Sequence, residues 1–283
     1  MLVEDKLRRL LEEDLGRGDI TSEVLIDSQT NIEGEIFCKE ECIVGGLREA
    51  STLFEMYGCR VNPMVREGEK VRRNSKILRL RGNAGTILAL ERTALNLMMR
   101  MSGIATETDQ ILSAVKASNP SLIIAGTRKT APGMNVFDKR AISIGGGDTH
   151  RLGLDDALLI KDNHIAIVGS IKKAVKKAKS KTSFTKKIEV EVRDGREAEE
   201  AASAGADIIL LDNLSPSQIR AVIKDLKQKK HRDDLLIEAS GGINRNNVRE
   251  YARTGVDVIS IGALTHSVKS IDMSLKVLDR SSK

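Results

Sequence analysis

The sequence predicts an α/β protein in which a parallel β/α barrel follows a smaller α+β domain. Six short apolar runs recur through the second half of the chain, and amphipathic segments with helical spacing separate the later runs. Strands that alternate with helices in this way form βαβ units with a parallel sheet, and six in succession favour a barrel over an open sheet. The six runs are Leu122–Ala125, Ala157–Ile160, Ile188–Val192, Asp207–Leu211, Leu235–Ala239 and Val256–Ile261.

The first half of the chain has a different pattern. An amphipathic helix is expected over Met1–Leu15, where apolar residues recur at helical spacing among charged ones. Antiparallel strands are expected at Val61–Val65 and Ile77–Leu80, because a charged turn joins them. The other elements expected here are strands at Asn31–Cys38 and Ile43–Gly46 and helices at Leu47–Tyr57 and Thr86–Ala117, the last one interrupted by Gly103.

These elements divide the chain into two domains. We expect the smaller domain over residues 1–105 and the barrel over residues 106–269. Gly205 and Gly255 follow two of the helical segments, as a glycine at the C-terminal end of a helix does. A last helix is expected at Ser270–Leu278, within residues 270–283, packing on either domain. The helices expected between the later barrel strands are Arg196–Ala204, Pro216–Lys227 and Asn247–Arg253.

The composition is that of a globular protein. Hydrophobic residues make up 40% and charged residues 30% of the 283 residues, and charges interrupt every apolar stretch before it could span a membrane. The first residues lack the apolar core and cleavage site of a signal peptide. The three cysteines, Cys38, Cys42 and Cys59, are sparse and lack metal-ligand spacing, so reduced thiols are expected. Together these features predict a cytoplasmic protein.

The net charge of +6 raises the question of an acidic partner. Nucleic acid is one candidate, but a chain with no Trp, two Tyr and four Phe has few residues on which bases could stack. Much of the positive charge also lies in Lys172–Lys187, whose apolar residues recur as on one face of a solvated helix. A small polyanion accounts for the charge equally well, and no nucleic-acid partner is expected.

Cations gather where the first two barrel strands end or begin. The carboxyl ends of the strands carry the functional groups of a parallel barrel. Like charges in one cleft repel each other unless a partner is present, and that partner is either an acidic neighbour on the rim or a ligand with several negative charges. The residues concerned are Thr127, Arg128, Lys129, His150, Arg151 and Lys161, with Arg92 as a further candidate.

Carboxylates follow in the middle of the barrel. Glu189 and Glu191 alternate with apolar residues on one strand, so both face the interior of the barrel, and Asp212 ends the next strand. An unpaired interior carboxylate is costly. Two kinds of partner are open: Lys129 and Lys161 in an ion-pair network, or ribose hydroxyls together with a substrate-borne magnesium ion.

Small residues follow the last two strands. Ser240, Gly241 and Gly242 come directly before a helix, and Gly262 and Ala263 occupy the equivalent place after the sixth strand. Backbone N–H groups in such turns and at helix N-termini bind anions. Two such turns in succession indicate a site for one phosphate group.

Ordered segments along nearly the whole chain match a known pattern. They are Glu13–Gly16, Gly18–Thr21, Glu91–Asn96, Ser102–Thr106, Ala125–Gly133, Gly145–Gly147, His150–Leu154, Leu159–His164, Glu189–Val192, Leu210–Asn213 and Glu238–Ile243. Together they closely resemble the quinolinate phosphoribosyltransferases, also called carboxylating nicotinate-nucleotide pyrophosphorylases. The resemblance implies an incomplete α/β (TIM-like) barrel with an N-terminal α/β sandwich domain.

The resemblance also implies the reaction and the assembly. Such an enzyme transfers the phosphoribosyl group of phosphoribosyl pyrophosphate to quinolinate, with Mg²⁺, and releases pyrophosphate and CO2 as it forms nicotinate mononucleotide for NAD synthesis. It is a homodimer with shared active sites, in which one N-terminal domain covers the partner's barrel and Arg92 reaches the neighbouring site. A trimer of dimers is a larger form of the same assembly.

The resemblance assigns a role to each site residue. Quinolinate carboxylates would be held by Arg128, Lys129, His150 and Arg151, with Thr127 beside them and Lys161 near the pyrophosphate. Glu191 and Asp212 would meet the ribose and its magnesium ion. Ser240, Gly241, Gly242, Gly262 and Ala263 would hold the 5-phosphate, and Lys129, Lys161, Glu191 and Asp212 would carry the catalytic step.

One departure and several alternatives remain at this point. Asp148 and Thr149 precede His150 where the family usually has a neutral residue and Asn, which places an extra carboxylate beside an anion site. A relative of the same fold could use another acceptor, such as nicotinate, or be the molybdenum-associated paralogue. A Schiff-base aldolase using Lys161 or Lys129 and a nucleic-acid-binding protein are the other classes.

Overall fold

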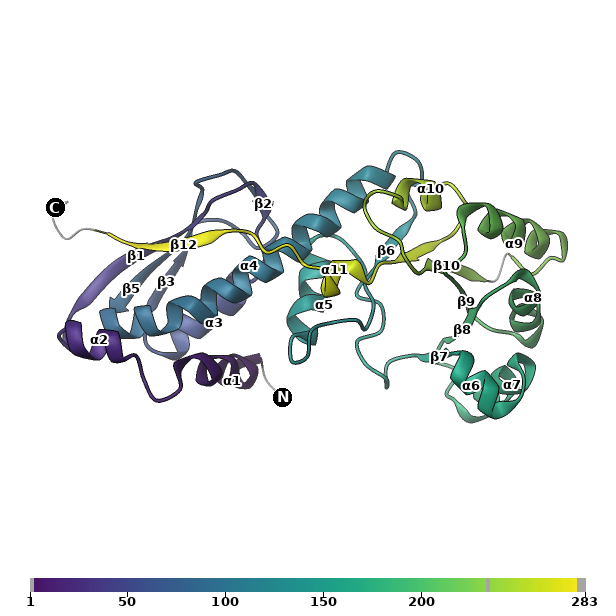
Figure 1. Cartoon of the computed structure of the whole chain (residues 1–283), viewed down its shortest axis with the longest axis horizontal. Helices are drawn as coiled ribbons and strands as arrows, with labels where there is room; N and C mark the ends of the chain where they lie inside the picture. Colours follow the sequence, from purple (N-terminus) through teal and green to yellow (C-terminus); the bar gives the residue numbers. More distant parts are fainter. Residues whose placement is uncertain (1–2, 233–234, 279–283) are drawn as a thin grey trace. The chain divides into compact units, whose positions relative to one another are not determined.

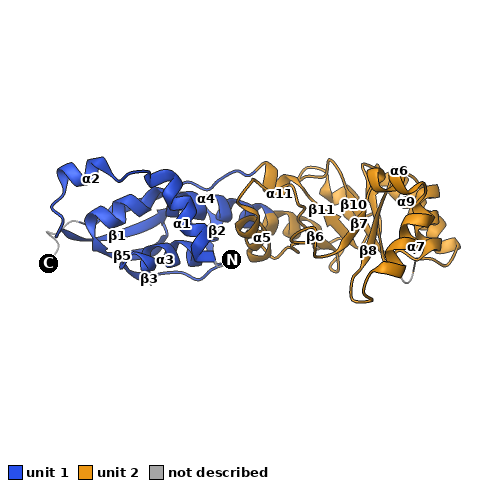
Figure 2. Ribbon diagram, turned by 90° about the horizontal axis from the view of Figure 1, so that it is seen from below, with its two compact units in different colours: residues 1–107, 268–283 blue, residues 108–267 orange. Residues whose placement is uncertain are grey.

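The computed structural model describes residues 3–232 and 235–278, which form two compact units (Figure 2). Unit 1 comprises residues 1–107 and 268–283, and unit 2 comprises residues 108–267. The sequence placed the division between residues 105 and 106 and assigned everything up to 269 to the barrel. In the part of the chain described, no helix is long and apolar enough to cross a membrane.

Unit 1 is a sheet of four antiparallel strands with helices packed against it (Figure 1). The strand order is β12-β1-β5-β3, and β1 pairs with both β12 and β5. A separate two-stranded ladder joins β2 and β4. The strands are β1 (Asn31–Cys38), β2 (Cys42–Ile43), β3 (Arg60–Pro63), β4 (Lys70–Val71), β5 (Lys76–Asn83) and β12 (Met273–Val277).

The helices of unit 1 bury their apolar faces. Leu7 and Leu11 of the first helix and Leu53 and Phe54 of the third are at most 1% exposed, as amphipathic spacing requires. The short second helix is capped at its N-terminus by Asp19, whose carboxylate accepts hydrogen bonds from two backbone N–H groups. The helices are α1 (Val3–Leu15), α2 (Ile20–Leu25), α3 (Leu47–Met56) and α4 (Ala84–Val115), the last of which continues into unit 2.

The helix expected at Ser270–Leu278 is wrong, because this segment forms strand β12. Its apolar residues, Ile271, Met273, Leu275 and Val277, occupy every second position, which is the period of a strand and not of a helix. Met273 is 3% exposed and Leu275 pairs with Ile36 of β1. Residues 279–283 of the expected helical segment lie outside the described residues.

Gly103 does not interrupt helix α4, which runs from Ala84 to Val115 without a break. A Cβ atom at Gly103 would lie 2.2 Å from the carbonyl oxygen of Lys269. Glycine is therefore required, because the segment before β12 crosses the helix at this point and leaves no room for a side chain. This contact outweighs the low helix propensity of glycine.

Unit 2 contains six parallel strands in the order β6-β11-β10-β9-β8-β7. This is the cyclic order of an α/β barrel opened between its first two strands, which lie at the two edges of the sheet. Strand β8 has the predicted bounds, and the other five lie within one or two residues of theirs. The strands are β6 (Ile123–Ala125), β7 (Leu158–Ile160), β8 (Ile188–Val192), β9 (Ile208–Asp212), β10 (Leu236–Ser240) and β11 (Val258–Ser260).

The segment around Asp148 lies beside the edge strand β6. Asp148 forms an isolated parallel bridge with Ala125, made by hydrogen bonds from Asp148 N to Ile124 O (2.8 Å) and from Gly126 N to Asp148 O (2.9 Å). A Cβ at Gly147 would lie 3.1 Å from the Ile124 carbonyl oxygen and closer still to two side chains. The glycine run thus lets the chain approach the barrel where a further strand would otherwise stand.

Helices surround the parallel sheet of unit 2 (Figure 1). Helix α8 packs against strands β8 and β9 and against helices α7 and α9. Val190, Val192, Ile209 and Leu211 on those strands are fully buried. The helices of this unit are α5 (Asn135–Ile144), α6 (Asp162–Val168), α7 (Ile171–Lys181), α8 (Gly195–Ala204), α9 (Pro216–Gln228), α10 (Val248–Ala252) and α11 (Ala263–His266).

Candidate active site

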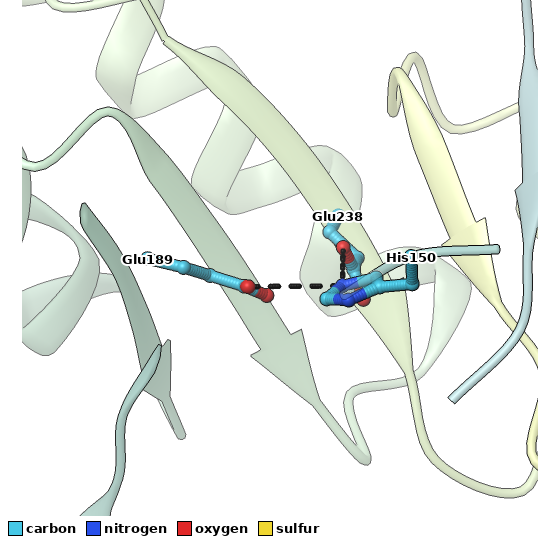
Figure 3. Close-up of side chains that lie close together, drawn as sticks. All are labelled: His150, Glu189 and Glu238. Atoms are coloured by element: carbon cyan, nitrogen blue, oxygen red, sulfur yellow. Dashed lines mark hydrogen bonds and ion pairs between the residues drawn. The ribbon is translucent and has the colours of Figure 1, made fainter. Parts of the chain in front are cut away.

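Three side chains from separate elements of unit 2 meet in the barrel interior (Figure 3). The imidazole Nε2 of His150 lies 3.2 Å from Glu238 Oε2 and 3.7 Å from Glu189 Oε2. Glu189 comes from β8 and Glu238 from β10, and each is 2% exposed. Both carboxylates alternate with buried aliphatic residues of their strands, so they project from the strand face opposite to those residues.

The backbone at His150 is held in an unusual conformation. Its φ of +53° lies in the left-handed region, which is uncommon for a residue with a side chain. The Asp148 carboxylate accepts a hydrogen bond from the His150 N–H at 2.6 Å, and the Lys139 ammonium donates to the Thr149 carbonyl. The carboxylate that departs from the family pattern is therefore part of the turn that presents His150 and Arg151.

The two glutamates determine the charge of the imidazole. Burial by itself lowers the pKa of His150, but the hydrogen bonds and negative charges of Glu189 and Glu238 outweigh burial and raise that pKa to about 10. The Arg151 N–H donates to Nδ1 at 2.8 Å, so a second proton on the ring has to displace this bond. Burial and the nearby charge of Glu238 raise the pKa of Glu189, although His150 and Arg151 act against them.

The same three residues offer ligand atoms to a metal ion. One imidazole nitrogen and two carboxylate oxygens lie within 4.8 Å of one another. Glu189 Oε1 and Glu238 Oε1 are buried without a hydrogen-bond partner in the described part of the chain. However, Nδ1 accepts a hydrogen bond from the Arg151 N–H, which leaves Nε2 to donate toward Glu238, and the charge of Arg151 also acts on Glu189. The negative charges of Glu189 and Glu238 are thus balanced by His150 and Arg151, without a metal ion.

Arg128 and Arg151 lie close enough for their charges to interact. The pKa of Arg151 is lowered, first by burial and then by the charge of Arg128. The same two guanidinium groups help to lower the pKa of Lys139. Within residues 3–232 and 235–278, neither Arg128 nor Arg151 forms an ion pair. Unit 2 thus brings two guanidinium groups close together, and the charges of Glu189, Glu191 and Glu238 act on Arg151 without an ion pair being formed.

Lys161 is different, because its ammonium group pairs with Glu191. Lys161 follows β7, Glu191 lies near the carboxyl end of β8, and these strands are neighbours in the sheet. This is the ion pair that the sequence left open as one of two arrangements. Asp212, at the end of β9, instead accepts a hydrogen bond from the Asn213 side-chain amide at 2.7 Å.

Both glycine turns follow their strands as expected, but helix α10 begins only at Val248, so Ser240, Gly241 and Gly242 do not lie directly before a helix. Gly241 and Gly242 have φ values of +93° and +63°, and a Cβ at Gly241 would lie 2.3 Å from Asn213 Oδ1. The Ser240 hydroxyl accepts a hydrogen bond from Ser260 at 2.9 Å. Gly262 and Ala263 begin the short helix α11.

Lys129 lies next to the second of these turns. Its Cδ atom would be 3.0 Å from a Cβ at Gly262, so glycine leaves room for the lysine side chain. Its backbone carbonyl accepts a hydrogen bond from Thr265 at 2.8 Å, and its N–H donates to Thr127 Oγ1 at 3.1 Å. These contacts join the loop after β6 to the loop after β11. Arg92 alone lies in unit 1, exposed on α4.

Sequence reasoning missed two residues of this site. Glu238 occupies alternate positions of its strand with Leu236 and Ser240, the same period-two signal that identified Glu189 and Glu191. Lys139 gave no such signal, because the sequence did not predict helix α5, and a lysine in an amphipathic helix is ordinarily solvated.

The fold and this site together define an α/β-barrel enzyme with a cationic site at the carboxyl ends of its strands. Comparison with known families identifies the family within this class of enzymes. The family "Quinolinate phosphoribosyl transferase, N-terminal domain" matches residues 19–102, and "Quinolinate phosphoribosyl transferase, C-terminal domain" matches residues 104–276. The chain belongs to the quinolinate phosphoribosyltransferase family.

Individual relatives cover nearly the whole chain. Proteins named as probable carboxylating nicotinate-nucleotide pyrophosphorylases from Methanocaldococcus jannaschii and Methanothermobacter thermautotrophicus are 49% and 46% identical to it, over 96% of this chain and 96% and 98% of their own lengths. The solved nicotinate-nucleotide pyrophosphorylase of Francisella tularensis has a TM-score of 0.87 at 37% identity, covering 98% of this chain and 96% of that one. That of Ehrlichia chaffeensis gives 0.91 at 33%, covering 98% and 99%.

Proposed function

We propose that this chain transfers the phosphoribosyl group of phosphoribosyl pyrophosphate to quinolinate and releases pyrophosphate and CO2. The observation that carries the proposal is the pair of guanidinium groups of Arg128 and Arg151 in unit 2, whose charges interact and which form no ion pair within the described residues. Quinolinate has two adjacent carboxylates, and guanidinium groups bind carboxylates through paired hydrogen bonds. The two guanidinium groups repel each other in the free protein, and an acceptor with two negative charges would remove this repulsion. This supports a dianionic acceptor.

The donor would occupy the neighbouring loops. The backbone N–H groups after β10 and β11, beside Gly241 and Gly262, suit the 5-phosphate. Asp212 and Glu191 at the ends of β9 and β8 suit the ribose hydroxyls, and Lys161 and Lys129 suit the pyrophosphate. Hard oxygen ligands of this kind fit Mg²⁺ that arrives with the donor. Bound in this way, the ion would supply positive charge to the leaving pyrophosphate.

Catalysis would rest on positioning and charge. The ring nitrogen of quinolinate forms a bond to the anomeric carbon as the bond to pyrophosphate breaks, and positive charge develops on the ribose. Glu191 and Asp212 would stabilise that charge, and the lysines would stabilise the leaving group. The positive ring nitrogen then stabilises the electron pair that stays on the adjacent carbon when its carboxylate departs as CO2, and a proton from solvent forms the C–H bond at that carbon. None of these steps requires a general base, and holding two mutually repelling anions together contributes most.

The site would be completed by a second subunit. Arg92 is exposed on α4 and belongs to the unit without the barrel. In the same unit, Ile20, Val24 and Leu25 of α2 are each at least 74% exposed, and an apolar patch of this kind is typical of an interface. A homodimer, in which Arg92 enters the site of the partner subunit, accounts for both features. Assembly of three such dimers is compatible with it.

The proposed compartment is the cytoplasm. Cys38, Cys42 and Cys59 are free thiols and all are buried. Free cysteines are typical of a reducing compartment, in which both proposed substrates are also expected.

A direct assay tests the proposed reaction. The purified chain is incubated with phosphoribosyl pyrophosphate, Mg²⁺ and quinolinate labelled in the carboxylate next to the nitrogen. We expect labelled CO2 and nicotinate mononucleotide in equal amounts, and no product when nicotinate replaces quinolinate. Product from nicotinate without CO2 would instead identify an acceptor with one carboxylate and overturn the proposal.

A further inference from the structure

Building on the function proposed above, we propose that Lys139 is a positioning residue of the acceptor site. It holds the turn at Thr149, His150 and Arg151 in place through the Thr149 carbonyl, and its buried charge is completed by the carboxylates of the bound acceptor. Acceptor binding should therefore take up a proton at alkaline pH.

The first observation is the burial of this lysine. Lys139 is 1% exposed and comes from the middle of α5, between buried Phe137 and Ala141. A lysine is almost never fully buried unless its charge is paired. Within the described chain, its ammonium group forms no ion pair and donates a hydrogen bond to the neutral carbonyl of Thr149.

The second observation is that the Thr149 carbonyl belongs to the turn that presents His150 and Arg151. Thr149 is the residue before His150, whose positive φ is costly without support. Asp148 holds the turn from one side through the His150 N–H, and Lys139 holds it from the other through the Thr149 carbonyl. Glu189 and Glu238 hold the imidazole ring. The direction of the Arg151 side chain depends on this turn.

The third observation is the charge around Lys139. Four charged residues of the neighbouring loops act on the Lys139 ammonium group through their charges. They are Asp148, Asp156, Arg151 and Arg128. Burial is the main cause that lowers its pKa to about 8, with both arginines adding to the effect and both aspartates opposing it. An anion held by Arg128 and Arg151 would neutralise these two charges and favour the ammonium form. Lys139 is thus incompletely neutralised in the free protein and would be neutralised in the complex.

The sign of the pH effect follows from linkage. Below pH 8 Lys139 carries its proton whether or not the acceptor is bound. Above pH 8 the free protein loses this proton, while the bound acceptor restores it. Affinity for quinolinate should therefore fall with rising pH, by up to about tenfold per pH unit.

Two substitutions separate the two roles. Lys139→Gln keeps a donor for the Thr149 carbonyl but removes the charge, whereas Lys139→Met removes both. We expect Lys139→Gln to raise KM for quinolinate about tenfold or more at pH 7, with kcat nearly retained and with no further rise in KM between pH 8 and 9. Lys139→Met should also lower kcat. Lys177→Met, at an exposed site on α7, is the control for loss of one positive charge.

Calorimetry supplies a readout that a purely structural role would not change. Quinolinate is titrated into the native protein and into Lys139→Gln at pH 8.5, in buffers with different ionisation enthalpies, which gives the number of protons taken up. The native protein should take up a proton that the variant does not. Equal proton uptake in both proteins, or an unchanged KM in Lys139→Gln, would overturn the inference. If Lys139→Met does not fold, Lys139→Gln and the native pH profile still decide. Failure of the native protein to convert quinolinate would instead refute the proposed function.

Discussion

At the scale of single residues, the acidic groups of the site do not pair with all of its cations. Glu191 satisfies Lys161, and Glu189 and Glu238 satisfy His150. Arg128 and Arg151 form no ion pair within the described residues, and the charges of Glu189, Glu191 and Glu238 act on Arg151 only at longer range. The proposed acceptor supplies the missing negative charge, so substitutions here should change binding more than folding.

Substitution of either arginine should therefore affect quinolinate before it affects stability. A charge-assisted hydrogen bond contributes about 1.5–3 kcal/mol, so loss of the two made by one guanidinium should raise KM for quinolinate by roughly a hundredfold or more. We expect this for Arg128→Ala and Arg151→Ala, with little change in Tm since neither arginine has an ion pair in the described chain. Arg249→Ala, at an exposed site on α10, is the control. A variant with native KM would exclude that arginine from the site.

Glu238 should control the protonation of His150. A histidine whose folded-state pKa is raised to about 10 stabilises the fold fully below its unfolded pKa, near 6.5, and this stabilisation disappears as the pH rises through 10. Glu238→Gln removes one of the carboxylates responsible. The stability advantage of the native protein over this variant should thus be largest at pH 6 and shrink by up to ~1.4 kcal/mol per pH unit above 6.5.

Denaturant unfolding at several pH values, with an NMR titration of His150, measures this effect. Glu55→Gln, which removes a carboxylate from an exposed position on α3, should show no such pH dependence relative to the native protein. An advantage that does not vary between pH 6 and 10 would mean that Glu238 does not hold a charged imidazole.

At the scale of elements, the sequence predicted strands more reliably than it predicted what short or unusual segments do. Strand β8 has its predicted bounds because its alternation of Glu and aliphatic residues is unambiguous. The segment at Ser270–Leu278 was assigned to a helix although its period is two. Helix α5 was not predicted. Lys139 was missed as well, because helical propensity does not reveal which face of a helix a neighbouring loop will cover.

Gly103 provides a test at this scale. In an ordinary helix interior, Gly→Ala stabilises by about 1 kcal/mol. At Gly103 the added methyl group would lie 2.2 Å from the Lys269 carbonyl oxygen, so Gly103→Ala should instead destabilise unit 1 by about 1–3 kcal/mol. Gly85→Ala in the same helix meets no atom closer than 3.4 Å and should be neutral or stabilising. Thermal unfolding of both variants gives the comparison, and stabilisation by Gly103→Ala would show that the crossing segment does not pack there.

At the scale of the whole molecule, the parallel barrel was predictable, but the place at which it opens was not. Counting six apolar runs gives six strands, while the strand order alone shows that β6 and β7 are edges. The bridge between Ala125 and Asp148 explains why the opening lies there, since the glycine run brings a loop against β6. The sequence could predict that residues following the parallel strands lie at one edge of the sheet, because the carboxyl ends of parallel strands meet there, but it missed Glu238 and Lys139. The pairing of the site residues could not be predicted, because it depends on distances of a few ångströms between flexible side chains.

The proposed dimer makes one prediction that belongs to the assembly and to no single chain. Arg92→Ala and Arg128→Ala should each inactivate the pure homodimer, because one removes a cation given to the partner and the other removes a cation of the site itself. In a mixed dimer, one site carries both defects and the other carries neither. Random exchange of equal amounts of the two variants should therefore restore roughly one quarter of native activity. Activity is measured after the mixture has exchanged subunits, and each variant incubated alone is the control. If Arg92 serves the site of its own chain, every site in the mixture stays defective and no activity returns.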